Sequence, residues 1–183
     1  MAILKIARMG HPILLQRAEA ISPAQGQSVR QLIGDMVETL SDAGGVGLAA
    51  PQVHQSVRVI MFFVPEERAA PDAEEKSVPL TILINPEVEP VGKDTELGWE
   101  GCLSIPGLQG LVPRFRTIRY RGVALDGTMI EREASGFHAR VVQHEVDHLD
   151  GILYPMRMRD LSQLAFNEEW RRFVAERKEM TGK

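Results

Sequence analysis

Two histidines separated by three residues constrain the fold of this chain more than any other feature. His144 and His148 would lie on the same face of a helix, one above the other, so their imidazole nitrogens can converge on one metal ion. Glu145 borders that face, where a general base belongs if the metal carries a reactive water. A helix is supported by apolar residues at mostly three- and four-residue steps: Phe137, Val141, Val142, Val146 and Leu149. We therefore predict a metal-bearing helix around which the rest of the chain is arranged.

The size and composition of the chain indicate one ordinary globular domain, residues 1–183. Apolar residues make up 44% of it and charged residues 25%, as in globular proteins generally. The net charge of −4 gives no indication of DNA binding, and there is no run of about eighteen apolar residues that would predict a membrane span. The single cysteine, Cys102, excludes an internal disulfide. Because we also find no secretory signal at the start of the sequence, we expect a cytoplasmic protein.

Several regular elements can be predicted along the chain. Residues 26–42 give the clearest helix, because apolar residues recur at three- and four-residue steps and Gly44-Gly45 follows. Residues 65–78 are charged and proline-punctuated, which is typical of a surface loop. The other predicted elements are a buried strand at 57–64, a strand at 79–89 broken by Asn85-Pro86, a β-hairpin within 111–132 that turns at Asp126-Gly127, and a last helix at 159–180 with Leu161, Leu164, Trp170, Phe173 and Val174 inward.

A segment of small residues runs from Gly45 to Gln52. Glycine and alanine leave a backbone with little side-chain bulk, so another peptide could approach it and pair along its N–H and C=O groups. Gln52 adds an amide N–H donor at the end of this segment. A tight, closely packed turn would have the same composition, so the segment alone leaves both interpretations open.

Cys102 is a candidate for the third metal ligand. A lone cysteine is usually a small buried apolar residue, but this one stands in a short Gly-Cys-Leu-Ser segment rather than within an apolar run. A thiolate is a strong ligand for a borderline-soft divalent metal. Together with His144 and His148, Cys102 would supply three protein ligands and leave one coordination position open for water.

Three motifs then stand in a fixed order: Gly-Val-Gly-Leu-Ala-Ala-Pro-Gln at 45–52, Glu-Gly-Cys-Leu-Ser at 100–104, and Gln-His-Glu-Val-Asp-His at 143–148. In this combination the chain resembles the peptide deformylases, which remove the N-formyl group from new bacterial proteins. The resemblance covers nearly the whole chain, and the Cys-Leu-Ser sequence is similar to the type I enzymes. It implies an α+β fold, with mixed and antiparallel β-sheets packed around a central metal-bearing helix and with a C-terminal helix.

The resemblance also implies one divalent metal ion per chain, held by Cys102, His144 and His148. Ferrous iron is the native ion expected from the family, with zinc or nickel able to occupy the site in purified protein. The ligand pattern by itself would suggest zinc, because three ligands plus water is its common catalytic arrangement. Residue types therefore leave the choice of ion open.

The resemblance assigns further roles to individual residues. Glu145 would take the proton from the metal-activated water and later deliver it to the departing amine. The Gln52 side-chain amide and the Leu103 backbone N–H would stabilise the oxyanion. Three residues would pair with the substrate backbone and two would wall the pocket for the methionine side chain: Val46, Gly47 and Gly101 for pairing, Phe137 and Val141 for the pocket. An ion pair between Glu100 and Arg114 is expected to hold the cysteine loop.

Two other classes of protein could also use a helix with this pair of histidines. A zinc peptidase also uses a His-Glu-x-x-His helix, but its third ligand normally lies downstream, where only carboxylates such as Asp150 and Asp160 remain. A non-enzymatic metal-binding module would close its fourth position with a protein ligand. Neither class explains the glycine–alanine segment or Gln52. The partners expected are nascent N-formyl-methionyl peptides and, through the C-terminal helix, the ribosome, with no membrane and no direct DNA binding.

Overall fold

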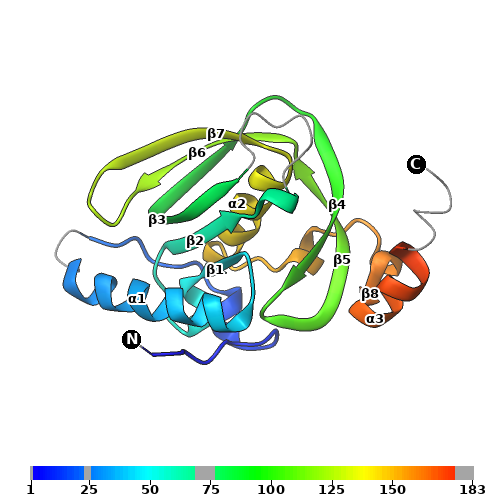
Figure 1. Cartoon of the computed structure of the whole chain (residues 1–183), viewed down its shortest axis with the longest axis horizontal. Coiled ribbons are helices and arrows are strands. Elements are labelled where there is room, and N and C mark those ends of the chain that lie inside the picture. Colours follow the sequence, from blue (N-terminus) through cyan, green and yellow to red (C-terminus); the bar gives the residue numbers. More distant parts are fainter. Residues whose placement is uncertain (1, 23–25, 69–76, 176–183) are drawn as a thin grey trace.

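Two antiparallel β-sheets lie on either side of one helix, α2, in a computed structural model that describes residues 2–22, 26–68 and 77–175 (Figure 1). The five-stranded sheet has the order β1-β2-β3-β6-β7, and the three-stranded sheet has the order β4-β5-β8. The strands are β1 Gly47–Ala49, β2 Val59–Val64, β3 Val78–Pro90, β4 Thr95–Cys102, β5 Ile105–Phe115, β6 Thr117–Val123, β7 Met129–Ser135 and β8 Leu164–Phe166. The helices are α1 Gly26–Ala43, α2 Gly136–Leu149 and α3 Asn167–Glu169, which continues as a π-helical segment, Trp170–Ala175. The α+β fold class expected from the sequence is confirmed.

The predicted amphipathic helix at 26–42 is confirmed as α1. Its buried side chains include Val29, Ile33, Met36 and Leu40, which are the three- and four-residue steps seen in the sequence. They join an apolar cluster with residues from β1 and β2, including Leu48, Val59 and Met61. These β1 and β2 side chains alternate with those that face α2, such as Ala49 and Ile60, so α1 packs on the opposite face of the five-stranded sheet from α2 (Figure 1).

Helix α2 makes different contacts with the two sheets. Its Ala139, Val142 and Leu149 are buried in an apolar cluster with side chains of the five-stranded sheet, such as Ile60 and Ile118. Toward the three-stranded sheet it presents Arg140, His144 and Asp147, all of which are buried and engaged with charged partners. The helix is therefore held to one sheet by apolar packing and to the other by ion pairs.

Two predicted strand boundaries are corrected by the structure. The strand expected to break at Asn85-Pro86 continues to Pro90 as β3, with a register shift between Ile84 and Glu87 where it pairs with β6. Asn85 takes a left-handed backbone conformation with φ 51°, and its side chain bonds both the N–H and the C=O of Ile21. A bulge held by this contact lets the strand pass the proline. The hairpin turning at Asp126-Gly127 is confirmed as β6–β7, whereas the residues before 116 belong to β5.

The predicted helix at 159–180 is wrong in its first part. Residues 161–163 form a 3-10 turn and Leu164–Phe166 form β8, which pairs with β5 from Leu108 to Gly110. Helical structure begins only at Asn167. Leu161 is 66% exposed and Phe173 is 50% exposed rather than inward, while the side chain of Val174 and residues 176–180 fall outside the described part. The charged segment 65–78 contains a 3-10 turn at Glu66–Arg68, and its residues 69–76 also fall outside the described part.

Candidate metal centre and substrate cleft

The three predicted metal ligands come together between α2 and the end of β4. One ligand atom from each of Cys102, His144 and His148 lies within 4.8 Å of the others, and no other such group of metal-binding side chains occurs among the described residues. The Cys102 Sγ atom is 3.2 Å from His148 Nε2. The carboxylates of residues 150–169, downstream of His148 in the described part of the chain, are not in this group. The third donor of the group is therefore the upstream thiol and not a downstream ligand as in the zinc peptidase pattern.

Glu100 orients the first histidine. His144 Nδ1 lies 2.8 Å from Glu100 Oε2, and because a carboxylate only accepts hydrogen bonds, Nδ1 carries the proton and Nε2 is left for a metal. The predicted ion pair of Glu100 with Arg114 is confirmed as a two-pronged contact, with N···O distances of 2.9 Å at both oxygens. Arg114 also reaches Asp147, which in turn bonds Arg157.

The charges of this network suit a metal-binding thiolate. Burial opposes ionisation of Glu100, but the hydrogen bonds from Arg114 and His144 outweigh it and hold the pKa of Glu100 below its usual range. Burial likewise opposes ionisation of Cys102, yet the nearby imidazoles of His148 and His144 lower the pKa of the thiol well below its usual value. The donor set is therefore one thiolate and two imidazole nitrogens, which fits a borderline divalent ion such as zinc, nickel or ferrous iron.

Glu145 is buried beside the three ligands, with 4% of its surface exposed. Burial raises the pKa of its carboxyl to about 7, and the charges of the two histidines only partly oppose that rise. Its Oε2 atom has no hydrogen-bond partner among the described residues. A Cβ atom placed on Gly47 would overlap Glu145 Oε1, so only glycine fits where β1 passes the carboxylate. The carboxyl of Glu145 thus has a pKa of about 7, and its Oε2 atom is available to accept a proton.

Gln52 and Leu103 lie at the same site. The Gln52 amide nitrogen donates to Ser104 Oγ at 3.1 Å and approaches Cys102 Sγ at 3.5 Å. Its oxygen accepts from the N–H of Ala49 at 2.9 Å, which fixes which way the amide points. Leu103 follows the cysteine directly and lines the same cavity. Both groups predicted to bind the oxyanion therefore border the metal ligands.

A cleft of about 390 Å³ opens over this site. Its walls include β1 and β4, which are the terminal strands of the two sheets as ordered. Every residue that the sequence assigned to substrate binding lines it: Val46, Gly47, Gly101, Phe137 and Val141. An extended peptide lying between two strand edges could pair with both, which is the mode of recognition known as β-augmentation.

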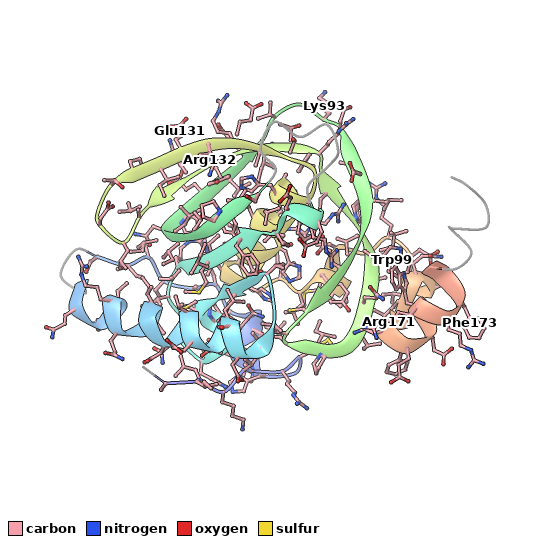
Figure 2. All side chains as sticks on the ribbon, in the orientation of Figure 1. Lys93, Trp99, Glu131, Arg132, Arg171 and Phe173 are labelled. Atoms are coloured by element: carbon pink, nitrogen blue, oxygen red, sulfur yellow. The ribbon has the colours of Figure 1, made fainter. Side chains whose placement is uncertain are left out.

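Among the lining residues that sequence reasoning did not assign to the cleft are Arg68, Trp99, Arg140 and Asn167. Arg68 lies over the Phe137 ring, 5.1 Å from its centroid. Trp99 packs edge-on against Trp170, so the C-terminal segment reaches the outer wall of the cleft, whereas Arg171 and Phe173 project from that segment (Figure 2). Arg140 alone gave a usable signal, because it lies four residues before His144 and so shares its face of the helix.

A Cys-His-His cluster, with a glutamate beside it and a peptide-sized cleft above it, defines a metal-binding hydrolase site. Comparison with known proteins places the chain within that class. Residues 3–164 match the family model for polypeptide deformylase. The chain is 52% identical to peptide deformylase 1 of Bordetella pertussis over 163 aligned residues. The aligned region covers 89% of this chain and 92% of the relative.

Solved structures agree with the sequence comparison. The class I type b peptide deformylase of Acinetobacter baumannii, in a crystal structure with Met-Ala-Ser bound, is 39% identical with a TM-score of 0.75 and covers 86% of this chain and 100% of its own. The Ehrlichia chaffeensis peptide deformylase is 29% identical with a TM-score of 0.80 and covers 100% and 98% of the two chains. The chain belongs to the polypeptide deformylase family. It is an enzyme that hydrolyses the N-terminal formyl group from newly made polypeptides.

Proposed function

We propose that Glu145 is the general base of this deformylation and that Cys102, His144 and His148 hold the metal ion. The observation that carries the assignment is the position of Glu145, buried against the three ligands with one oxygen unpartnered among the described residues. A divalent ion at that site supplies Lewis acidity, which lowers the pKa of a water molecule and polarises the formyl oxygen. Glu145 accepts the proton of that water and passes it to the departing amine.

Gln52 and Leu103 are proposed to stabilise the negative charge that develops on the formyl oxygen. The Gln52 amide is already oriented by Ala49 and Ser104, and its nitrogen lies 3.5 Å from Cys102 Sγ, so a donor is held beside the metal ligands. Val46, Gly47 and Gly101 would hold the substrate backbone between β1 and β4. Support comes from the Acinetobacter baumannii relative, whose structure has Met-Ala-Ser bound. Phe137 and Val141 would wall the methionine pocket, where burial of one such side chain contributes about 1.5–3 kcal/mol.

The experiment that tests these roles separates metal binding from chemistry. Glu145→Ala should keep one metal ion per chain and lose formate release by at least about 100-fold, the usual scale for a general acid–base group. His144→Ala should lose the metal ion itself. Retention of metal by His144→Ala together with its loss from Glu145→Ala would contradict the assignment.

Ferrous iron is the ion that we propose for this enzyme in the cell. A thiolate ligand and a ferrous ion are both electron-rich, so aeration should inactivate the iron-loaded enzyme. Samples reloaded with nickel or zinc should lose activity more slowly under the same aeration. Equal survival of activity with all three metals would contradict an iron-dependent site.

We also propose that residues 1–183 act as one domain in the cytoplasm and that the C-terminal segment contacts the ribosome. Arg171 and Arg172 are exposed and carry positive charge, which suits the phosphate backbone of ribosomal RNA. Changing both to glutamate should reduce cosedimentation with ribosomes and leave formate release from a short peptide unchanged. Undiminished cosedimentation would remove the ribosome proposal. No helix in the described part of the chain is long and apolar enough to cross a membrane.

A further inference from the structure

We propose that Arg140 is a positioning residue that holds strand β4 against the metal-bearing helix and thereby sets the width of the substrate cleft. This inference rests on the proposed assignment of the cleft between β1 and β4 as the place where the peptide binds. Arg140 lies on α2, one turn before His144, and its side chain is 8% exposed. It is a buried cation in a cleft whose reaction, as assigned above, does not use it.

The guanidinium group of Arg140 ties α2 to both strands of the β4–β5 ribbon. Its Nη2 donates to the carbonyl of Glu96 at 2.8 Å, and its Nη1 approaches the carbonyls of Val112 at 2.9 Å and Gly98 at 3.3 Å. Nη1 also lies 2.8 Å from Glu100 Oε1. One side chain therefore contacts three backbone carbonyls and the carboxylate that orients His144. A planar, permanently charged donor fork is needed for this set of acceptors, and lysine offers only a single ammonium group.

Gly98 leaves room for the guanidinium group of Arg140 against β4. A Cβ atom on Gly98 would lie 2.6 Å from Arg140 Cζ and 2.7 Å from its Nε and Nη2 atoms. Such distances are too short for non-bonded atoms, so any larger residue at this position would displace the guanidinium or move the strand. The space that Arg140 occupies against β4 thus depends on the absence of a side chain at Gly98.

The two walls of the cleft are fixed to the same helix by different means. Strand β1 belongs to the sheet that packs against the apolar side of α2, where Ala49 is buried with Ala139 and Val142. Strand β4 is held to α2 by Arg140 and by the Glu100 contacts to Arg114 and His144. Because the substrate backbone must reach both strand edges, the position of β4 relative to α2 decides whether both sets of hydrogen bonds can form. Loss of Arg140 should therefore weaken peptide binding more than it affects metal binding.

The test compares Arg140→Met with Arg140→Lys and with a control that contacts the C-terminal end of the same helix, Arg58→Met. Arg58 is also a poorly exposed arginine that bonds backbone carbonyls, those of Leu149 and Pro86, but it lines no part of the cleft. For formyl-Met-Ala-Ser, Arg140→Met should raise KM by about tenfold or more, the scale of a lost charged hydrogen bond. Arg140→Lys should recover part of that loss. Both should keep one metal ion per chain, because Arg114 still holds Glu100.

Stability must be measured on the same samples, since a merely structural arginine would lower the unfolding temperature without changing KM. Arg58→Met should lower the unfolding temperature and leave KM unchanged. Gly98→Ala provides an independent variant that disturbs Arg140 from the strand side, and it should raise KM in the same direction. Because both changes act on one contact, the Gly98→Ala/Arg140→Met double variant should show much less than the product of the two effects.

The proposal is overturned if Arg140→Met and Gly98→Ala each leave KM within about twofold of the unaltered enzyme. Should Arg140→Met fail to fold, Gly98→Ala alone decides, with a raised KM in support and an unchanged KM against. Failure of the underlying site assignment would look different, because Phe137→Ala, which alters the wall of the proposed methionine pocket, would then also leave KM for formyl-Met-Ala-Ser unchanged. Loss of the metal from Arg140→Met would also overturn the proposal, since it would place Arg140 in the support of the ligands and not of the strand.

Discussion

The burial of Glu145 has a cost in stability that can be measured in the metal-free protein. Its carboxyl is 4% exposed and its pKa is raised from 4.5 to about 7, first of all by burial. A carboxyl whose pKa is higher in the folded than in the unfolded chain binds more protons when folded, so the folded state loses stability as pH rises between the two values. A difference of 2.5 pKa units corresponds to about 3 kcal/mol of unfolding free energy. This loss of stability is fully present above about pH 7 and absent below about pH 4.5.

Replacement of Glu145 by glutamine removes this cost and keeps the shape of the side chain. Urea unfolding of both metal-free proteins should therefore give a gap in unfolding free energy that grows from near zero at pH 4.5 to about 3 kcal/mol at pH 8, with the variant the more stable. Other ionisable groups are common to both proteins and should largely cancel in the difference. Glu66→Gln, at an exposed position, is the matched control and should show no such growth.

Loading with nickel should narrow the gap at pH 8, because a nearby positive charge favours the ionised carboxylate. The reasoning would be refuted if the unfolding free energies of the unaltered chain and of Glu145→Gln changed with pH in parallel. They would mean that Glu145 ionises in the folded state as easily as in water, and the buried, proton-accepting role proposed for it would lose its physical basis.

Three other expectations follow from the geometry. Gly47→Ala should keep the metal but lower formate release by about 100-fold, measured as kcat/KM, because the added Cβ displaces the Glu145 carboxylate; unaltered kinetics would contradict the close approach. Arg114→Met should lower the unfolding free energy by about 3–5 kcal/mol in urea, since it leaves the buried acids Glu100 and Asp147 each short of a partner; a loss under about 1 kcal/mol, the scale of a surface pair, would count against the network. Formyl-methionyl peptides should be preferred over acetyl-methionyl peptides by at least about a thousandfold in kcat/KM, because the extra methyl group overpacks the site and shifts the carbonyl from its donors; comparable hydrolysis of both would point to a broader amidase.

The sequence carried enough information to predict the elements whose residues repeat regularly. Helix α1 followed from the apolar steps of Val29, Ile33, Met36 and Leu40, because a single stripe of this kind can be buried only as a helix. The β6–β7 hairpin followed from Asp126-Gly127, since glycine readily adopts the positive φ, here 90°, that the turn requires. Local chemistry decides both elements, so both could be read without knowing the rest of the fold.

Elements fixed by distant partners could not be predicted in the same way. Leu164 reads as part of an amphipathic helix, but it lies in β8 because β5 offers backbone hydrogen bonds at Gly110. Asn85 and Pro86 read as a break, but the side chain of Asn85 is satisfied by Ile21, sixty-four residues away in sequence. In each case a tertiary contact overrides the local preference.

The same distinction between local chemistry and distant contacts applies to the candidate site. Cys102, His144 and His148 could be proposed as ligands because thiolates and imidazoles bind divalent metals and because two of them are four residues apart. Three of the four acceptors of Arg140 could not be proposed, since they are main-chain carbonyls of Glu96, Gly98 and Val112, and any residue type supplies a carbonyl. Sequence reasoning finds chemistry that depends on particular side chains and misses support that depends on backbone position.

The unequal attachment of α2 to the two sheets has a consequence for how the native protein opens. Apolar packing joins the helix to the five-stranded sheet, whereas a few charged side chains join it to β4 and β5. Local openings separate the units with the weakest mutual burial first. Amide hydrogens of β4 should therefore exchange with deuterium faster than those of the interior strand β2, and peptide bound between β1 and β4 should slow exchange mainly in β4. In this enzyme the bound substrate would then hold together the two sheets, which can otherwise separate locally without global unfolding.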